Sequence, residues 1–150
     1  LHYAFQTTDK LCFVMDFVNG GDIFGLIQRT RKLPETWARF YSAQIVMCLE
    51  YLHTMGIVYR DLKPENVMID KHGFLKLTDF GLSNDAVADR TYSIVGSAFY
   101  IAPEIVLKQG HDQAADWWSL GILTYEMMVG VPPHFDRSVS HSKSYQLLLT

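Results

Sequence analysis

Residues 59–81 read YRDLKPENVMIDKHGFLKLTDFG, a polar loop followed by two short apolar runs. The runs NVMID (66–70) and FLKLTDF (74–80) surround the turn sequence KHG, which is the pattern of a β-hairpin. A hairpin places its two outer ends side by side. This stretch decides the fold, because it brings the polar loop and the end of the second run to one place.

The predicted hairpin gathers oxygen ligands at its open end. With the turn centred on the KH pair, we expect Asn66 roughly opposite Leu77 and Asp79 just beyond it. An amide oxygen and a carboxylate suit Mg²⁺, which completes its coordination with phosphate and water. Asp61 and Lys63 lie on the loop that enters the same end, where a proline disfavours helix. Phosphoryl transfer requires this set of a free carboxylate, an ammonium and two metal ligands.

Three further segments predict helices. The segment PETWARFYSAQIVMCLEYLHTMG (34–56) repeats apolar residues at three- and four-residue spacing. The segment ADWWSLGILTYEMMVG (115–130) is apolar nearly all round, with Asp116 as its expected N-cap and Gly130 at its end. The shorter DIFGLIQRT starts at Asp22, a suitable N-cap residue.

The N-terminal part predicts a second hairpin. LHYAF is the expected partner of KLCFVMDFV (10–18), whose β-branched and aromatic content indicates a buried strand. Residues 81–104 lack strong periodicity, so we expect a functional loop there. We expect His53 at the surface, near a helix C-terminus, and Trp117 and Trp118 in the core.

The composition is that of one globular domain. The 150 residues are 49% hydrophobic and 19% charged. The net charge of −3 does not indicate a nucleic-acid-binding protein, which would carry a basic surface. The most apolar stretch, 117–131, is short for a membrane span and carries Glu126. Cys12 and Cys48 lie in apolar contexts, so we expect reduced thiols in a cytoplasmic or nuclear protein. The opening LHYAF has no initiator Met and suggests a fragment.

Several motifs together resemble the eukaryotic protein kinases. YRDLKPEN resembles their catalytic loop H-R-D-x-K-x-x-N, while DFG (79–81) and APE (102–104) match the bounds of their activation segment. The tyrosine at 59, the KPEN sequence and the DWWSLG motif (116–121) indicate the AGC group. ARFYSAQIV resembles the cyclic-AMP-dependent kinases, and KLTDFGLS resembles the ribosomal-protein kinases. The resemblance covers about residues 1–135.

The resemblance implies an α+β, protein-kinase-like fold that is truncated at both ends. Residues 1–15 would be the end of the small lobe, 16–21 the hinge and 22–150 part of the mainly α-helical large lobe. ATP and Mg²⁺ would be the cofactors. The glycine-rich loop and the ATP-anchoring lysine of the family are not in the sequence, so we expect the fragment to be inactive alone.

The resemblance also implies catalytic roles. Asp61 would be the catalytic aspartate, Lys63 the γ-phosphate contact, and Ser97 the residue that contacts both and favours serine or threonine substrates. Asn66 and Asp79 would be the Mg²⁺ ligands, and Asp116 would brace the backbone of the catalytic loop.

Nucleotide contacts would come from the hinge and from the floor of the adenine pocket. Met15 would be the gatekeeper, and Met68 the floor, although both could be plain core methionines. The full set of implied nucleotide contacts is Met15, Asp16, Val18, Asp22, Glu65 and Met68. A regulatory hydrophobic stack would contain Leu1, Tyr59 and Phe80.

Control and specificity are implied by charged positions. Arg60 would bind a phosphate on Ser93, added by an upstream kinase, although Arg60 could instead bind a surface carboxylate and Ser93 could stay unmodified. Asp22, Glu65 and Glu126 match AGC positions that receive arginines preceding the target residue, so we expect protein substrates with basic residues there. Glu126 could instead have a structural partner. We expect no nucleic-acid or membrane partner.

Rival interpretations remain open. A pseudokinase or truncated isoform could act as a binding or regulatory module, although Asp61, Asn66 and Asp79 are intact. A small-molecule phosphotransferase of kinase-like fold would not be expected to carry the APE and DWW motifs. A purely structural helical fragment leaves the polar constellation unexplained.

Overall fold

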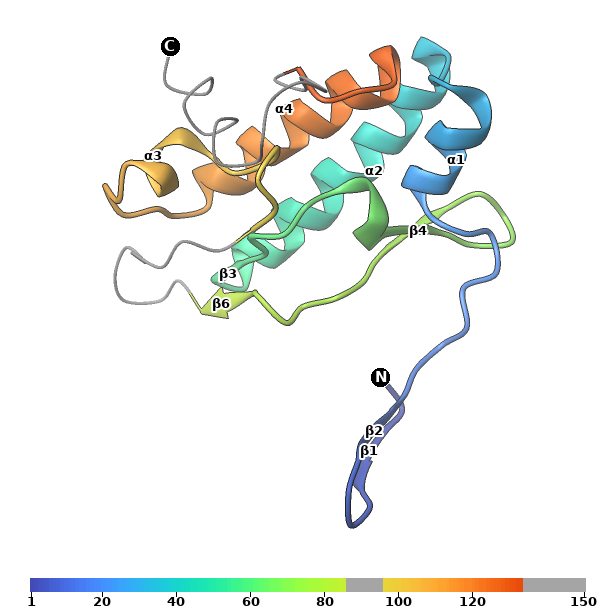
Figure 1. Ribbon diagram of the computed structural model, residues 1–150, viewed down its shortest axis with the longest axis vertical. Helices are drawn as coiled ribbons and strands as arrows, with labels where there is room; N and C mark the ends of the chain where they lie inside the picture. The colour runs from blue at the N-terminus through green and yellow to red at the C-terminus, as the bar shows by residue number, and fades with distance from the viewer. Residues whose placement is uncertain (86–95, 134–150) are drawn as a thin grey trace.

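The computed structural model describes residues 1–85 and 96–133, and its short strands and helices confirm the predicted α+β class. Its elements, drawn in Figure 1, are β1 (Tyr3–Gln6), β2 (Leu11–Val14), α1 (Ile23–Thr30), α2 (Glu35–Thr54), β3 (Ile57–Val58), the 3₁₀ helix η1 (Pro64–Asn66), β4 (Val67–Ile69), β5 (Leu75–Leu77), β6 (Asn84–Asp85), α3 (Pro103–Val106) and α4 (Ala114–Val129).

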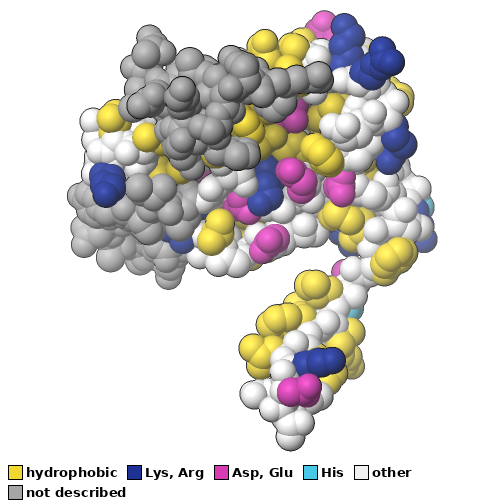
Figure 2. Space-filling view, in the orientation of Figure 1, with side chains coloured by type: hydrophobic (Ala, Val, Ile, Leu, Met, Phe, Trp, Pro, Cys, Tyr) yellow, Lys and Arg dark blue, Asp and Glu magenta, His cyan; other side chains and the backbone are white. Residues whose placement is uncertain are grey.

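Strands β1 and β2 form the predicted N-terminal hairpin, which projects away from the helical body (Figure 1). Tyr3 pairs with Val14 and Gln6 with Leu11. The expectation that residues 10–18 form a buried strand is wrong, because Phe13 is 63% exposed and Phe17 is 91% exposed. Figure 2 shows the hydrophobic side chains along this hairpin. Residue type predicted the strand, but burial requires a covering surface, and the described helices pack elsewhere.

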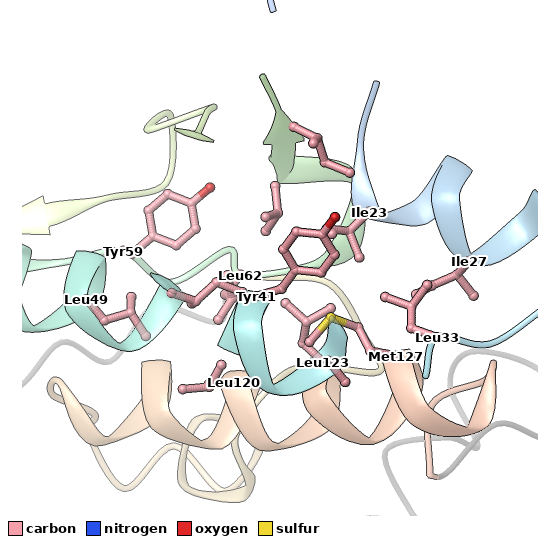
Figure 3. Close-up of a cluster of buried hydrophobic side chains, with 14 of the residues drawn as sticks. Ile23, Ile27, Leu33, Tyr41, Leu49, Tyr59, Leu62, Leu120, Leu123 and Met127 are labelled. Carbon is pink, nitrogen blue, oxygen red and sulfur yellow. The ribbon is translucent and has the colours of Figure 1, made fainter. Parts of the chain in front are cut away.

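Helices α2 and α4 lie side by side and enclose the main core (Figure 1). Ser42 and Thr124 join them through a hydroxyl contact of 2.9 Å. Leu49 and Leu123 are fully buried between them, and α1 adds its own apolar face (Figure 3). Truncating one such leucine to alanine costs about 2–5 kcal/mol, because the core relaxes only partly around the cavity.

Strands β4 and β5 form the second predicted hairpin with a register one residue away from the expected one. Asn66 lies opposite Thr78 rather than Leu77, since the Thr78 amide donates to the Asn66 carbonyl at 3.0 Å. The cause is a three-residue turn, in which the carboxylate of Asp70 accepts the amides of His72 and Phe74 at 2.8 and 2.9 Å. The turn is therefore centred on His72.

The segment between β2 and α1 is fastened to β4. The amide of Gly20 donates to the carbonyl of Ile69 at 2.9 Å, and the amide of Ile69 donates to the carbonyl of Gly21 at 2.8 Å. A Cβ atom on Gly20 would lie 2.3 Å from the Ile69 carbonyl oxygen, so this approach requires glycine. The carboxylate of Asp22 then caps α1 by accepting the amide of Gly25 at 2.6 Å, as predicted.

Helix α4 begins and ends close to the predicted bounds, but its cap differs. Gln113 is the N-cap residue, whereas Asp116 lies inside the first turn and uses its carboxylate elsewhere. Gly130 ends the helix with a φ of 98°, as predicted. Trp117 is 40% exposed, which corrects the expectation that it lies in the core, whereas Trp118 packs against a second cluster around Ile105. No helix in residues 1–85 or 96–133 is long and apolar enough to span a membrane.

Candidate functional site

Asp61 is the centre of a compact polar network at the loop between β3 and η1. Its side chain is 5% exposed and accepts hydrogen bonds from three other side chains. One carboxylate oxygen, Oδ2, accepts from Lys63 Nζ at 2.8 Å and from Asn66 Nδ2 at 2.9 Å. The other, Oδ1, accepts from the hydroxyl of Ser97 at 3.1 Å. The structure therefore brings together four of the predicted site residues, although Ser97 lies 36 positions along the chain from Asp61.

Asn66 is held rigidly by its own amide nitrogen. Its Nδ2 donates to both the carboxylate and the main-chain carbonyl of Asp61, each at 2.9 Å, and the side chain is 6% exposed. The nitrogen is thus committed to Asp61, which leaves the amide oxygen as the atom suited to a cation.

Asp79 stands at the end of the neighbouring strand. Thr78 donates to the carbonyl of Asn66 through both its amide and its hydroxyl, at 3.0 and 3.2 Å, so Asp79 follows directly after the residue paired with Asn66. Asp79 has a φ of 56°, and its carboxylate is exposed and accepts the amide of Gly81 at 3.2 Å. An amide oxygen and an exposed carboxylate form an oxygen donor set that fits Mg²⁺.

The described residues contain no cluster of His, Cys, Asp and Glu side chains that could bind a metal ion by itself. Within residues 1–85 and 96–133, no group of three or more His, Cys, Asp or Glu side chains could hold a metal ion. A cation bound by the Asn66 and Asp79 oxygens would therefore require further ligands from a phosphate or from water.

The loop backbone in front of Asp61 is braced by Asp116 of α4. The carboxylate of Asp116 accepts the amide of Tyr59 at 2.9 Å and the amide of Arg60 at 2.8 Å. Arg60 has a φ of 68°, a left-handed conformation that costs energy for a residue with a Cβ atom. The two bonds hold this conformation, and Asp61 follows directly.

His53 completes the environment of Asp116, and the sequence analysis missed it. The expectation of a surface residue is wrong: its side chain is 8% exposed and its Nε2 lies 2.8 Å from Asp116 Oδ2. One signal was present in the sequence, because His53 comes four residues after the buried Leu49 and so shares its helix face. Its partner is 63 positions away, which no local pattern reports.

The predicted nucleotide-contacting residues lie in two places: the segment between β2 and α1, and the region of η1 and β4. Met15 and Asp16 are exposed, and the Asp16 carboxylate contacts the ring of His2 at 2.7 Å. That contact, followed by the charge of Lys76, lowers the pKa of Asp16. Asp22 pairs with Met68 of β4 as an isolated bridge, which brings two of the predicted residues together. Val18 is half-buried and Glu65 is exposed.

Two of the three residues predicted for the hydrophobic stack meet. The rings of Tyr59 and Phe80 are in edge contact, with centroids 5.3 Å apart, and the Tyr59 hydroxyl donates to the Thr78 carbonyl. Burial, followed by the charge of Asp61, raises the pKa of Tyr59. Leu1 does not join them, because it is 75% exposed on the projecting hairpin.

Arg60 is half-buried and contacts the segment that directly follows the DFG motif. Its Nε donates to the carbonyl of Leu82 at 2.6 Å, and burial lowers the pKa of its guanidinium, partly countered by the charge of Asp116. Ser93, its predicted phosphate-bearing partner, lies outside the described residues.

Glu126 is buried in α4 and has a structural partner. The hydroxyl of Tyr100 donates to its carboxylate, and the side chain is 5% exposed. Burial raises the pKa of Glu126 to about 6; the bond from Tyr100 lowers it, and the negative charge of Glu65 raises it further. Glu65 and Glu126, two of the three predicted arginine-binding residues, are therefore close enough to repel each other.

Comparison with known proteins assigns the chain to a family. The family model described as "Protein kinase domain" matches residues 1–148. Serine/threonine-protein kinase Sgk3 of Rattus norvegicus is 53% identical over 142 residues, which cover 93% of this chain and 29% of that protein. Serine/threonine-protein kinase Sgk2 of Homo sapiens is 48% identical over 142 residues, covering 93% of this chain and 39% of that protein. Protein kinase 2 of Dictyostelium discoideum is 49% identical over 150 residues, covering 99% of this chain and 31% of that protein.

The chain spans about a third of the length of these relatives. Its match to the family model covers nearly the whole sequence, and the relatives agree with the AGC resemblance predicted from the YRDLKPEN and DWWSLG motifs. The chain belongs to the protein kinase domain family and is part of a kinase domain of the AGC group.

Proposed function

We propose that the protein transfers the γ-phosphate of ATP to serine or threonine hydroxyls of protein substrates. The observation that carries this proposal is the network around Asp61, in which one buried carboxylate accepts from Lys63, Asn66 and Ser97. Phosphoryl transfer depends mainly on positioning and on neutralising charge, and this network supplies fixed positions for both.

Each residue of the network has a separate task in this proposal. Asp61 orients the substrate hydroxyl and accepts its proton as the new O–P bond forms, while the bond from the γ-phosphorus to the β–γ bridging oxygen breaks and ADP leaves. Lys63, fixed by its 2.8 Å contact with Asp61, presents an ammonium to the transferred phosphoryl group. Ser97 contacts the same carboxylate at 3.1 Å and places the activation segment against the acceptor site.

Asn66 and Asp79 would hold Mg²⁺ through their side-chain oxygens. When bound, the ion would neutralise charge on the ATP phosphates. The support is the donor set described above: an amide oxygen held in place by two bonds from the amide nitrogen to Asp61, and an exposed carboxylate at the end of the paired strand.

Because we expect this chain to be inactive alone, the experiment uses the full-length protein and compares it with its Asp61→Asn variant in an assay of γ-phosphate transfer from labelled MgATP to a serine peptide. Loss of the proton acceptor should reduce kcat by about 10² or more. The matched control is Asp9→Asn, an exposed aspartate in the turn between β1 and β2, which should leave kcat unchanged. Equal rates for the protein and Asp61→Asn would remove the proposal.

We also propose that substrates carry arginines before the target residue. Glu65 is exposed, and Glu126 is a buried carboxylate that accepts the Tyr100 hydroxyl, so an incoming guanidinium would offset the negative charge of both carboxylates. The half-buried Asp22 would provide the third carboxylate, although it already caps α1.

A peptide panel with and without upstream arginines tests this specificity. Arginine should lower KM, and Glu65→Gln should reduce that preference, whereas Glu50→Gln, an exposed position on α2, should not. A preference that survives in Glu65→Gln would exclude that residue from arginine recognition.

Two further proposals concern regulation and place of action. Phosphorylation of Ser93 by an upstream kinase would create a phosphate group that Arg60 binds. The two cysteines carry no disulfide, which supports a reducing compartment such as the cytoplasm or nucleus.

A further inference from the structure

We infer that Ser119 of α4 is a positioning residue for Ser97 and, through it, for Asp61. Ser119 is 7% exposed, and its hydroxyl donates to the main-chain carbonyl of Tyr100 at 2.8 Å. The catalytic consequence of this contact rests on the proposed kinase function. Its structural part, the attachment of residues 97–100 to α4, rests on the described contacts alone.

The hydroxyl of Ser119 has one proton and two carbonyl oxygens within reach. The second oxygen belongs to Ala115 and lies at 3.1 Å. Ala115 and Ser119 are four residues apart in α4, so the Ala115 carbonyl also accepts the regular helical bond from the Ser119 amide. The Tyr100 carbonyl lies closer to the hydroxyl, and Tyr100 is buried, so the bond from Ser119 replaces hydration that this carbonyl has lost.

A chain of hydrogen bonds leads from Ser119 to the catalytic carboxylate. The Tyr100 carbonyl accepts from Ser119, and the Tyr100 amide donates to the Ser97 carbonyl at 2.9 Å, which closes a turn over residues 97–100. At the other end of this turn, the Ser97 hydroxyl donates to Asp61 Oδ1 at 3.1 Å. Because the turn is short and closed, a displacement at Tyr100 also moves Ser97.

The space around these groups leaves little room for the turn to shift. A cavity of about 10 Å³, about the smallest that holds a water molecule, is lined in part by Asp61, Ser97, Tyr100 and Ser119. Helix α4 also holds the Tyr100 ring, because the Tyr100 hydroxyl donates to the Glu126 carboxylate. Ser119 and Glu126 therefore attach the backbone and the side chain of one residue, and the backbone contact is the one that fixes the turn.

A double-mutant cycle in the full-length protein tests the path through Ser97. Ser119→Ala removes the donor and places a good helix former in α4, whereas Ser97→Ala removes the contact with Asp61. We expect kcat for phosphorylation of a serine peptide to fall about five- to tenfold in Ser119→Ala, with little change in KM for ATP. Adding Ser119→Ala to Ser97→Ala should reduce kcat no further, because the contact through which Ser119 acts is already lost.

The matched control is Ser42→Ala, the same substitution at another hydroxyl that contacts α4. The Ser42 hydroxyl lies 2.9 Å from that of Thr124, between α2 and α4. The kcat of Ser42→Ala should equal that of the unsubstituted protein. An equal loss of kcat in Ser42→Ala and Ser119→Ala would assign the effect to a general weakening of α4 and would overturn the inference.

Amide hydrogen exchange gives a readout that requires no catalytic activity. The amides of Tyr100 and Ile101, on either side of the Tyr100 carbonyl, should exchange faster in Ser119→Ala than in the unsubstituted protein or in Ser42→Ala. The amide of Leu49 in the main core should exchange at the same rate in all of them. If the full-length protein transfers no phosphate, the proposed function fails, and these exchange rates alone decide whether Ser119 holds the turn.

Two further results would overturn the inference. Unchanged exchange at residues 100 and 101 in Ser119→Ala would show that the turn does not depend on the hydroxyl. Faster exchange with kcat fully retained, or losses of kcat that add in the double variant, would show that Ser119 does not act through the contact between Ser97 and Asp61.

Discussion

Glu126 makes the stability of the protein depend on pH in a way that a single substitution isolates. Its carboxylate is buried in α4, and burial raises its pKa from the ordinary value of 4.5 to about 6. Glu126→Gln keeps the shape and an oxygen that can accept the Tyr100 hydroxyl, but it cannot ionise. Comparing the two proteins therefore reports the titration of this one group.

The sign follows from proton binding. Between pH 4.5 and about 6, the folded protein binds the Glu126 proton and the unfolded chain releases it, so rising pH favours unfolding. The stability contribution of protonated Glu126 is complete below pH 4.5 and is lost as the pH passes through about 6. A pKa difference of about 1.5 units corresponds to roughly 2 kcal/mol, which is a large share of a typical unfolding free energy.

The assay is urea unfolding followed by circular dichroism, at several pH values from 4 to 7.5, for the protein and for Glu126→Gln. The unfolding free energy of the protein minus that of Glu126→Gln should fall by about 2 kcal/mol between pH 4 and 7.5. Other titrating groups cancel in this difference, and Glu50→Gln, at an exposed position, should give a flat difference curve. A flat curve for Glu126→Gln as well would refute the assignment of a raised pKa to this carboxylate.

Three other substitutions test the scaffold of the site. Asp116→Asn replaces one of two acceptor oxygens by an N–H group, and should lower the unfolding free energy by about 3 kcal/mol in urea titrations; a loss below about 1 kcal/mol would contradict the bracing role. Gly20→Ala places a methyl group 2.3 Å from the Ile69 carbonyl oxygen, so the Tm should fall, and an unchanged Tm would show that the segment moves freely. Ser97→Ala removes one 3.1 Å donor to Asp61 and should lower kcat about tenfold, measured by peptide phosphorylation, without a change in Tm; a lowered Tm with unchanged kcat would make the hydroxyl structural.

Features governed by local sequence were predicted well. The apolar repeat in residues 34–56 predicted helix α2, and the N-cap residue Asp22 predicted the start of helix α1. Both signals lie in or next to the helix that they describe. The β4–β5 hairpin was also predicted, but its register was wrong by one residue. The Asp70 side chain extends the turn to three residues, which strand patterns do not reveal.

Features that depend on distant surfaces were predicted poorly. The strand at 10–18 has a buried-strand composition, yet its burial depends on what packs over it, and Phe13 remains exposed. Helix-end patterns placed His53 at the surface and made Asp116 an N-cap, and only the family resemblance implied that Asp116 braces the catalytic loop. The contact between His53 and Asp116 joins residues 63 positions apart. The hairpin pattern predicted that Asn66 binds Mg²⁺ with Asp61 and Lys63 close by, and the family resemblance added the individual roles of Asp61 and Lys63. These roles stay predictions until activity is measured.

The most direct test of the central claim is the Mg²⁺ dependence of ATP binding. The claim is that Asn66 and Asp79 provide oxygens for one ion at the open end of the β4–β5 hairpin. Titration calorimetry of the full-length protein with a non-hydrolysable ATP analogue should show that Mg²⁺ strengthens binding to the unsubstituted protein and to the control Asp9→Asn, but not to Asp79→Asn. An equal gain from Mg²⁺ in Asp79→Asn would contradict the account, because the ion would then be held without this carboxylate.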